Sequence, residues 1–271
     1  MAGTLRILYI GDIMGRPGRQ VIAQELPKLR EKYKVDVVIA QAENVSHGKS
    51  MSTAHMRELQ KAGVDGFSGG NHTIERPSIK ELLAEPGEPV VAPLNQQGSE
   101  AGWGAKVLAT DAGPVLMVSL LGTVFPAVVP ASNPLAAIDT LLAQVSNQHF
   151  AAIIVNFHGD FSSEKRVIGY YLDGRVTAVI GDHWHVPTAD AMILPDGTAH
   201  ITDVGMCGTL HSSLGVTKEI IISRWRDGVK IKNDIAEGGP YQLNAALVTA
   251  DAKTGLAKSI KPVNLVIEKL R

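Results

Sequence analysis

The sequence predicts an α/β fold in which a parallel sheet is combined with an antiparallel half. In the first third of the chain, apolar β-rich runs alternate with segments of helical spacing, a pattern typical of parallel strands with helices on the faces of the sheet. Later, turn signals at Pro195-Asp196-Gly197 and Lys253-Thr254-Gly255 separate short apolar runs, as in antiparallel pairs. No linker divides the 271 residues, so we expect a single domain over residues 1–271.

The first third gives clear element signals. β-rich runs predict strands over Leu5–Ile10, Val35–Ala40 and Val64–Ser68. The glycine-rich residues 11–18 are expected to form a turn-forming loop. The spacing of apolar residues then predicts helices over 18–33, with a kink at Pro27, and over 52–62, with Ser52 as the cap.

The remaining elements are shorter and less regular. The predicted strands are Val90–Ala92, Gly104–Ala109, Val115–Leu120, Ala151–Phe157, Val176–Ile180, Met192–Leu194, Ala199–Thr202, Asn244–Ala250 and Val263–Glu268. The predicted helices are Pro134–Ser146, Ser163–Leu172 and Val216–Arg226. The last two strands should form a late antiparallel pair.

Composition excludes several classes of protein. The net charge is −1, with acidic and basic residues interspersed, so stable nucleic-acid binding is not expected. The single cysteine, Cys207, rules out a disulfide framework and fits a reducing cytoplasm. Apolar runs are too short to span a membrane.

Polar residues follow the predicted strands in an unusual concentration. They are Asp12, Glu43, Asn44, Asn71, His72, His158, His183 and His185. A lone aspartate after a strand is usually a turn former or cap, and a lone buried histidine is usually a core group. Parallel strands, however, bring their carboxyl ends to one edge of a sheet, where ligands bind. The joint pattern therefore predicts a metal site.

The stretch Gly181–Pro187 is expected to close this site. In an extended chain, residues i and i+2 point to the same side, so His183 and His185 should present two imidazoles to one place. Imidazole is the commonest metal ligand at neutral pH. Trp184 would then point the opposite way, in a packing role.

These motifs resemble a known superfamily. Gly11-Asp12, Gly70-Asn71-His72, His158 and Gly181–His185 are similar to the spaced motifs of the calcineurin-like metallophosphoesterases. The fuller pattern resembles the YmdB-like branch of 2′,3′-cyclic-nucleotide 2′-phosphodiesterases, on the segments 11–19, 43–44 with 48–49, 70–73, 163–165, 185–190 and 202–206. The resemblance implies a four-layer β-sandwich flanked by helices, around a two-metal site.

The resemblance also implies roles for single residues. Asp12, Glu43, Asn44 and His185 would hold one metal, while Glu43, Asn71, His158 and His183 would hold the other. Glu43 would bridge the two metals, and His72 would be the catalytic proton donor. The superfamily usually has a further histidine ligand in its first motif, but Ile13 and Met14 follow Asp12 here.

The chemistry of these residue types supports such a site. Nitrogen and oxygen ligands without thiolate suit Fe, Mn, Zn, Co or Ni, and the resemblance implies two metal ions, iron or alternatively manganese. Two divalent ions carry four positive charges, and the carboxylates of Asp12 and Glu43 offset two of them, which leaves two positive charges. A metal-bridging hydroxide, the expected nucleophile, together with a phosphodiester monoanion cancels them.

The expected activity is hydrolysis of 2′,3′-cyclic nucleotides, such as 2′,3′-cyclic AMP, to 3′-nucleotides. A broader phosphatase or phosphodiesterase, and a nucleotide-responsive regulator with slow turnover, stay open as alternatives. A homo-oligomer, dimer or tetramer, is expected, with the apolar segment Thr123–Pro130 and the late strands as candidate surfaces.

Several further residues have two interpretations. Asp182 and Trp184 replace threonines that are usual in the branch, and are expected to alter the rim of the site. Cys207 is expected to be a buried filler. His211 is equally compatible with the site and with the surface. For Arg16 and Arg19, capping and pairing on the first helix is favoured over phosphate binding, and for His47 and Lys49 a solvated loop is favoured.

Overall fold

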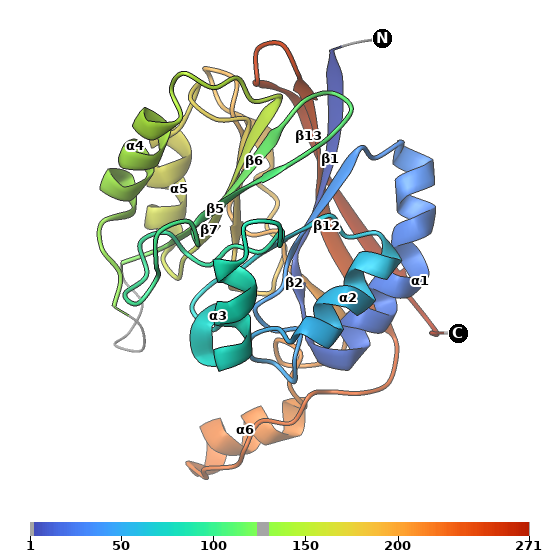
Figure 1. Ribbon diagram of the computed structural model, residues 1–271. Coiled ribbons are helices and arrows are strands. Elements are labelled where there is room, and N and C mark those ends of the chain that lie inside the picture. The colour runs from blue at the N-terminus through green and yellow to red at the C-terminus, as the bar shows by residue number, and fades with distance from the viewer. Residues whose placement is uncertain (1–2, 124–129, 271) are drawn as a thin grey trace.

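The computed structural model describes residues 3–123 and 130–270. Its strands form two sheets (Figure 1). The first sheet has the order β2-β11-β12-β1-β3-β4, and β13 also pairs with β12. The bounds are β1 (Thr4–Ile10), β2 (Asp12–Ile13), β3 (Val37–Gln41), β4 (Gly66–Ser68), β11 (Met206–Thr209), β12 (Tyr241–Asp251) and β13 (Ala257–Ile267).

The second sheet has the order β5-β6-β7-β8-β10-β9. Its bounds are β5 (Ala105–Leu108), β6 (Val115–Leu121), β7 (Ala152–His158), β8 (Ala178–Asp182), β9 (Met192–Ile193) and β10 (Ala199–Ile201). The central strands β6, β7, β8 and β10 are parallel, and the edge strands β5 and β9 are antiparallel to their neighbours.

The two sheets pack face to face. Alternate residues of β1 show why this strand is apolar along its whole length: Ile7 and Tyr9 belong to the core between the sheets, whereas Leu8 and Ile10 belong to the core under the helices. Because both faces of β1 are buried, the strand has no polar face.

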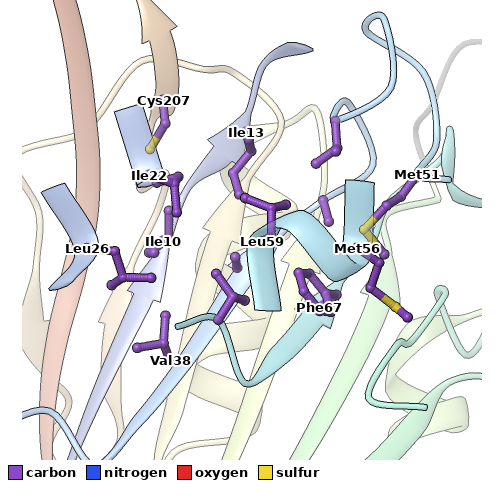
Figure 2. Packing of buried hydrophobic residues seen from close by; sticks show 14 of the residues in the cluster. Ile10, Ile13, Ile22, Leu26, Val38, Met51, Met56, Leu59, Phe67 and Cys207 are labelled. Carbon is purple, nitrogen blue, oxygen red and sulfur yellow. The ribbon is translucent and has the colours of Figure 1, made fainter. Parts of the chain in front are cut away.

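Helices cover both outer faces. The first sheet is covered by α1 (Gly15–Tyr33), α2 (Thr53–Ala62) and α3 (Pro77–Ala84). Leu26 of α1 and Leu59 of α2 are gathered in one cluster with Val38 of β3 (Figure 2). The second sheet is covered by α4 (Pro134–Gln144) and α5 (Ser162–Tyr171). The resulting order of helices, sheet, sheet and helices confirms the four-layer α/β fold.

The remaining helix, α6 (Lys218–Asp227), buries none of its residues and projects from one end of the molecule (Figure 1). A short 3₁₀ helix, η1 (Thr73–Glu75), follows β4. Among the described residues, no helix combines the length and apolarity needed to cross a bilayer. Residues 124–129 of the segment considered for oligomer contacts lie outside the described ranges, so that expectation stays a prediction.

Three local predictions were wrong or incomplete. The turn-forming loop over 11–18 is instead split between β2 and the start of α1 at Gly15, because β2 pairs with the distant β11. The predicted strand Val90–Ala92 is reduced to a bridge between Val90 and Phe67. It lies between two prolines, which lack the N–H needed for a strand ladder. Sequence patterns did not predict α3 or β11.

Candidate metal centre

The predicted site residues come together at the carboxyl ends of the strands. Asp12 lies on β2, directly after β1; Glu43 and Asn44 follow β3, and Asn71 and His72 follow β4. His158 is the last residue of β7, and His183 directly follows β8. Residues from both sheets therefore meet at the edge formed by the carboxyl ends of the strands, as expected for an α/β ligand site.

Around Glu43, the side chains are tightly connected. His158 Nε2 lies 3.1 Å from Glu43 Oε1 and 2.8 Å from Asn71 Oδ1. The rings of His158 and His183 have centroids 4.7 Å apart. One ligand atom each from Glu43, His158 and His183 lies within 4.8 Å of the others, close enough to coordinate a single ion. We call these four residues, Glu43, Asn71, His158 and His183, the Glu43 half of the site.

The second group surrounds Asp12. Asn44 Nδ2 donates a hydrogen bond to Asp12 Oδ1 over 3.0 Å and lies 3.4 Å from His185 Nε2. His185 Nε2 is 3.6 Å from Asp12 Oδ1, and its Nδ1 is 3.1 Å from the carbonyl oxygen of Leu214. We call Asp12, Asn44 and His185 the Asp12 half of the site. Asn44 and Glu43 are neighbours in the chain, so the two halves are continuous.

Close approach of the backbone to His158 depends on Gly70. A Cβ atom at this position would lie 2.4 Å from the His158 ring, closer than any side chain can tolerate. The glycine before Asn71 therefore allows the β4 loop to bring Asn71 Oδ1 against His158.

Asp182 has a different role from the one expected. It was predicted to alter the rim of the site, but its side chain is fully buried and its Oδ1 lies 2.7 Å from His158 Nδ1. Its Oδ2 accepts hydrogen bonds from Asn156 Nδ2 and the Tyr9 hydroxyl. Contact at Nδ1 fixes the ring of His158 so that Nε2 faces Glu43 and Asn71. Such carboxylate–histidine pairs orient metal-binding histidines in proteins.

The histidine loop is not extended, contrary to the prediction. β8 ends at Asp182, and both His183 (φ 103°) and His185 (φ 62°) have left-handed backbones. The i, i+2 argument therefore does not apply: His183 lies in the Glu43 half and His185 in the Asp12 half. Backbone strain of this kind persists only where surrounding contacts impose it.

A buried lysine supplies those contacts. Lys165 of α5 is fully buried, and its Nζ donates to the carbonyl of Asp182 over 2.6 Å and to Asp203 Oδ2 over 2.7 Å. Asp203 Oδ2 also accepts from the backbone N–H of Trp184, whose ring lies 4.3 Å from Lys165 Nζ. The packing role expected for Trp184 is confirmed. The ion pair thus anchors both ends of the peptide between Asp182 and Trp184.

Burial sets the protonation states of the histidines. Burial lowers the pKa of His158 to about 3, and burial together with the charge of His158 lowers that of His183 to about 3. Both rings are then neutral at physiological pH, as metal ligands must be. For His185, burial acts in the same direction, but the Asp12 carboxylate raises the pKa above its ordinary value.

The carboxyl groups respond to each other. Burial, and then the negative charge of Asp12, raises the pKa of Glu43 and of Asp182 well above the usual range. Burial alone would also raise the pKa of Asp12, but the adjacent His185 holds it below its ordinary value. Three buried carboxyl groups at one place thus compete for cationic partners.

The donor set fits metal ions. Asp12 Oδ2 is buried and has no hydrogen-bond partner among residues 3–123 and 130–270. An unsatisfied buried carboxylate oxygen is costly unless a cation coordinates it. The imidazoles of His158 and His183 are neutral, and the oxygen and nitrogen donors are those preferred by Fe, Mn and Zn. Divalent ions would offset the crowded carboxylates and give Asp12 Oδ2 a partner.

His72 lies at the edge of this cluster. Its backbone N–H donates to Glu43 Oε2 over 2.8 Å, and its ring Nδ1 lies 2.5 Å from Glu75 Oε1. Glu75 Oε2 is in turn 3.1 Å from Lys49 Nζ. Sequence reasoning missed Glu75, although its position three residues after His72 on a turn of helix could have indicated the contact.

The other candidates divide between structural roles and exposed positions. Cys207 is buried in the core under α1, which confirms its prediction as a filler. Arg19 pairs with Glu58 of α2 and donates to the carbonyl of Val45, also a structural role. Three further candidates are exposed, namely Arg16, His47 and His211.

Comparison with known proteins relates the chain to a family. The family model described as "YmdB-like protein" matches residues 8–263. A Bacillus subtilis (strain 168) protein named 2′,3′-cyclic-nucleotide 2′-phosphodiesterase is 35% identical over 96% of both chains. The crystal structure described as a novel phosphatase from Mycoplasma pneumoniae is 32% identical, with a TM-score of 0.90 over 99% of this chain and 96% of that one.

A more distant likeness concerns the fold alone. The NAD nucleotidase of Haemophilus influenzae is 15% identical, with a TM-score of 0.57 over 98% of this chain and 56% of that chain. The fold is accordingly of the metallophosphoesterase type. The family match covers most of the chain and includes every predicted site residue. The chain therefore belongs to the YmdB-like family.

Proposed function

We propose that this chain is a metal-dependent phosphodiesterase that opens 2′,3′-cyclic nucleotides at the 2′ oxygen and releases 3′-nucleotides. The observation that carries the proposal is the buried cluster of Glu43, Asn71 and His158, with His72 hydrogen-bonded at its edge. The name of the Bacillus subtilis relative supports this substrate. A cytoplasmic location is part of the proposal, because the single buried thiol fits a reducing compartment.

We assign the two halves of the site to two metal ions. Asp12, Glu43, Asn44 and His185 would hold one ion, and Glu43, Asn71, His158 and His183 the other. Iron is our first assignment and manganese the alternative, since the donors are nitrogen and oxygen. Bound at this place, the ions supply Lewis acidity and a water molecule of lowered pKa.

His72 is the proton donor in this proposal. A ribose alkoxide is a poor leaving group, so protonation of the departing 2′ oxygen is needed. In this proposal Glu75 accepts a hydrogen bond from Nδ1–H of His72, and the ring acts as an imidazolium that gives the proton on its other nitrogen, Nε2, to the departing 2′ oxygen. The backbone hydrogen bond from His72 to Glu43 keeps the donor next to the metal ligands.

The charge of the site favours a diester. Two divalent ions carry four positive charges, from which the ligands Asp12 and Glu43 remove two. A hydroxide on the ions and a phosphodiester monoanion would together cancel the remaining two positive charges, whereas a hydroxide and a phosphomonoester dianion would exceed them by one.

The test combines a substrate panel with a variant of His72. We expect the metal-loaded protein to convert 2′,3′-cyclic AMP to 3′-AMP in preference to phosphomonoesters. His72→Ala should lower turnover by about 10²–10⁴-fold, the usual contribution of a positioned acid, while metal content stays near wild type. The exposed His211→Ala serves as the matched control, with wild-type turnover.

Three results would contradict the proposal. Formation of 2′-AMP alone would reverse the regiochemistry, and unchanged turnover in His72→Ala would remove that residue from the mechanism. Preference for phosphomonoesters would favour a phosphatase, the activity in the description of the Mycoplasma pneumoniae structure.

A further inference from the structure

A pocket lies between the loop that follows the ligand candidate Asn44 and the segment around α6. It has a volume of about 360 Å³. Its polar lining consists of His47, Lys49, Arg224, Lys232 and Asn233, and its apolar wall includes Met14 and Ile235.

The charge of this pocket has one sign. The basic lining residues are Lys49, Arg224 and Lys232, and none of the lining residues is acidic. Lys49 is paired with Glu75, and Arg224 donates to the carbonyl of Ile231. Lys232 forms no ion pair within residues 3–123 and 130–270. The pocket thus has three basic side chains, of which only Lys49 is paired with a carboxylate, and such a lining is suited to a phosphate group.

The pocket is joined directly to the catalytic machinery. The N–H groups of Gly15 and Gly48 both donate to the carbonyl of Asn44, over 3.0 and 3.1 Å. Lys49 and His72 contact opposite oxygens of the same Glu75 carboxylate, at 3.1 and 2.5 Å. Lys49 of the pocket is thus linked through the Glu75 carboxylate to His72, the residue that would protonate the leaving oxygen.

We propose that this pocket binds a second phosphate of the substrate, on the 5′ side of the ribose whose cyclic phosphate is opened. The inference rests on the proposed function, and it narrows the substrate to cyclic nucleotides with such a phosphate. The group is either a 5′-phosphate or the internucleotide phosphate of an oligoribonucleotide that ends in a 2′,3′-cyclic phosphate. The apolar wall at Met14 and Ile235 would contact the intervening nucleoside.

The experiment compares three substrates at low salt. They are 2′,3′-cyclic AMP with a free 5′-hydroxyl, the same nucleotide with a 5′-phosphate, and a dinucleotide with a free 5′-hydroxyl and a terminal 2′,3′-cyclic phosphate. We expect kcat/KM to be higher by about 10-fold or more for a substrate with the second phosphate, mainly through KM. The advantage should shrink as ionic strength rises. The second and third substrates distinguish the two sources of phosphate.

Variants localise the effect. Lys232→Ala and Arg224→Ala should each reduce the ratio of kcat/KM between phosphorylated and unphosphorylated substrates by several-fold. Lys253→Ala, an exposed lysine in the turn between β12 and β13, should keep the wild-type ratio. Equal kcat/KM for all three substrates, or a ratio that neither pocket variant changes, would overturn the inference while leaving the proposed function intact.

If no substrate is turned over, a binding measurement tests the second-phosphate pocket separately from the proposed phosphodiesterase function. Calorimetry with adenosine 3′,5′-bisphosphate and with 3′-AMP should then show tighter binding of the bisphosphate, reduced in Lys232→Ala. Equal affinities would overturn the second-phosphate site as well.

Discussion

The two halves of the candidate metal centre differ in how they are assembled. In the Glu43 half, His158 is held at both ring nitrogens, by Asp182 on one side and by Asn71 and Glu43 on the other. In the Asp12 half, His185 stands 3.6 Å from Asp12, and Asp12 Oδ2 has no hydrogen-bond partner among the described residues.

The difference indicates how much of the site the fold itself provides. Hydrogen bonds arrange the Glu43 half and burial keeps its histidines neutral, so it needs little rearrangement to receive a cation. The Asp12 half is held by attraction between Asp12 and His185, whose pKa is raised by that carboxylate against the effect of burial. Because the contacts of His158 already position the ligands of the Glu43 half, we expect that half to bind its ion first.

Removing the charge of Glu43 should have the largest effect, because this residue belongs to both proposed ligand sets. Glu43→Gln is expected to lose both metals. Its turnover should fall by more than the roughly 10–100-fold cost of altering an outer-shell partner. Elemental analysis of the purified variant measures the metals, and the exposed Glu219→Gln is the control. Two ions per chain in Glu43→Gln would refute the bridging role.

Replacement of Asp182 should have a smaller effect, mainly on the Glu43 half of the site. Asp182→Asn preserves the size of the side chain but removes the carboxylate behind His158. We expect metal affinity to fall by about 10–100-fold for the ion held by His158, with a weaker effect on the Asp12 half. Metal titration by calorimetry would resolve the two binding steps, with the exposed Asp111→Asn as control. Equal weakening of both steps would show that the halves are not independent.

How far the sequence predicts this site depends on how local each signal is. Asp12, Glu43, Asn71 and His158 could be identified because each ends an apolar strand or lies within a few residues of its end. The contact of Asp182 with His158 arises from the register of β7 and β8, which places the two residues opposite each other. Register between strands is a tertiary property, and no local pattern encodes it.

The same reasoning applies to the fold. The alternation of strands and helices predicted the α/β class, since hydrophobic periodicity is a local property. β11 was missed because it is a short strand defined by pairing with β2 and β12. The left-handed backbones of His183 and His185 were missed because Lys165 and Asp203, distant in sequence, hold that loop.

The smallest expected effect concerns the layer behind the Asp12 half. Cys207 pairs with Ile13 in the β11–β2 register, and burial raises the pKa of its thiol to about 12. An ordinary thiol would be partly ionised at pH 8, whereas the buried thiol of Cys207 stays protonated there. We therefore expect iodoacetamide to leave Cys207 unmodified in the native protein and to label it in denaturant, as mass spectrometry would show.

The raised pKa of Cys207 also determines how the stability of the folded protein changes with pH. The folded state retains the thiol proton up to about pH 12, whereas the unfolded chain loses it near the ordinary thiol pKa of 9.0. This contribution to stability is complete below pH 9.0 and is lost as pH rises toward 12. Cys207→Ala should remove that loss from the alkaline denaturation profile. Rapid labelling of native protein at pH 8 would instead show that the strand behind Asp12 opens readily, which would make the two halves differ in rigidity as well as in charge.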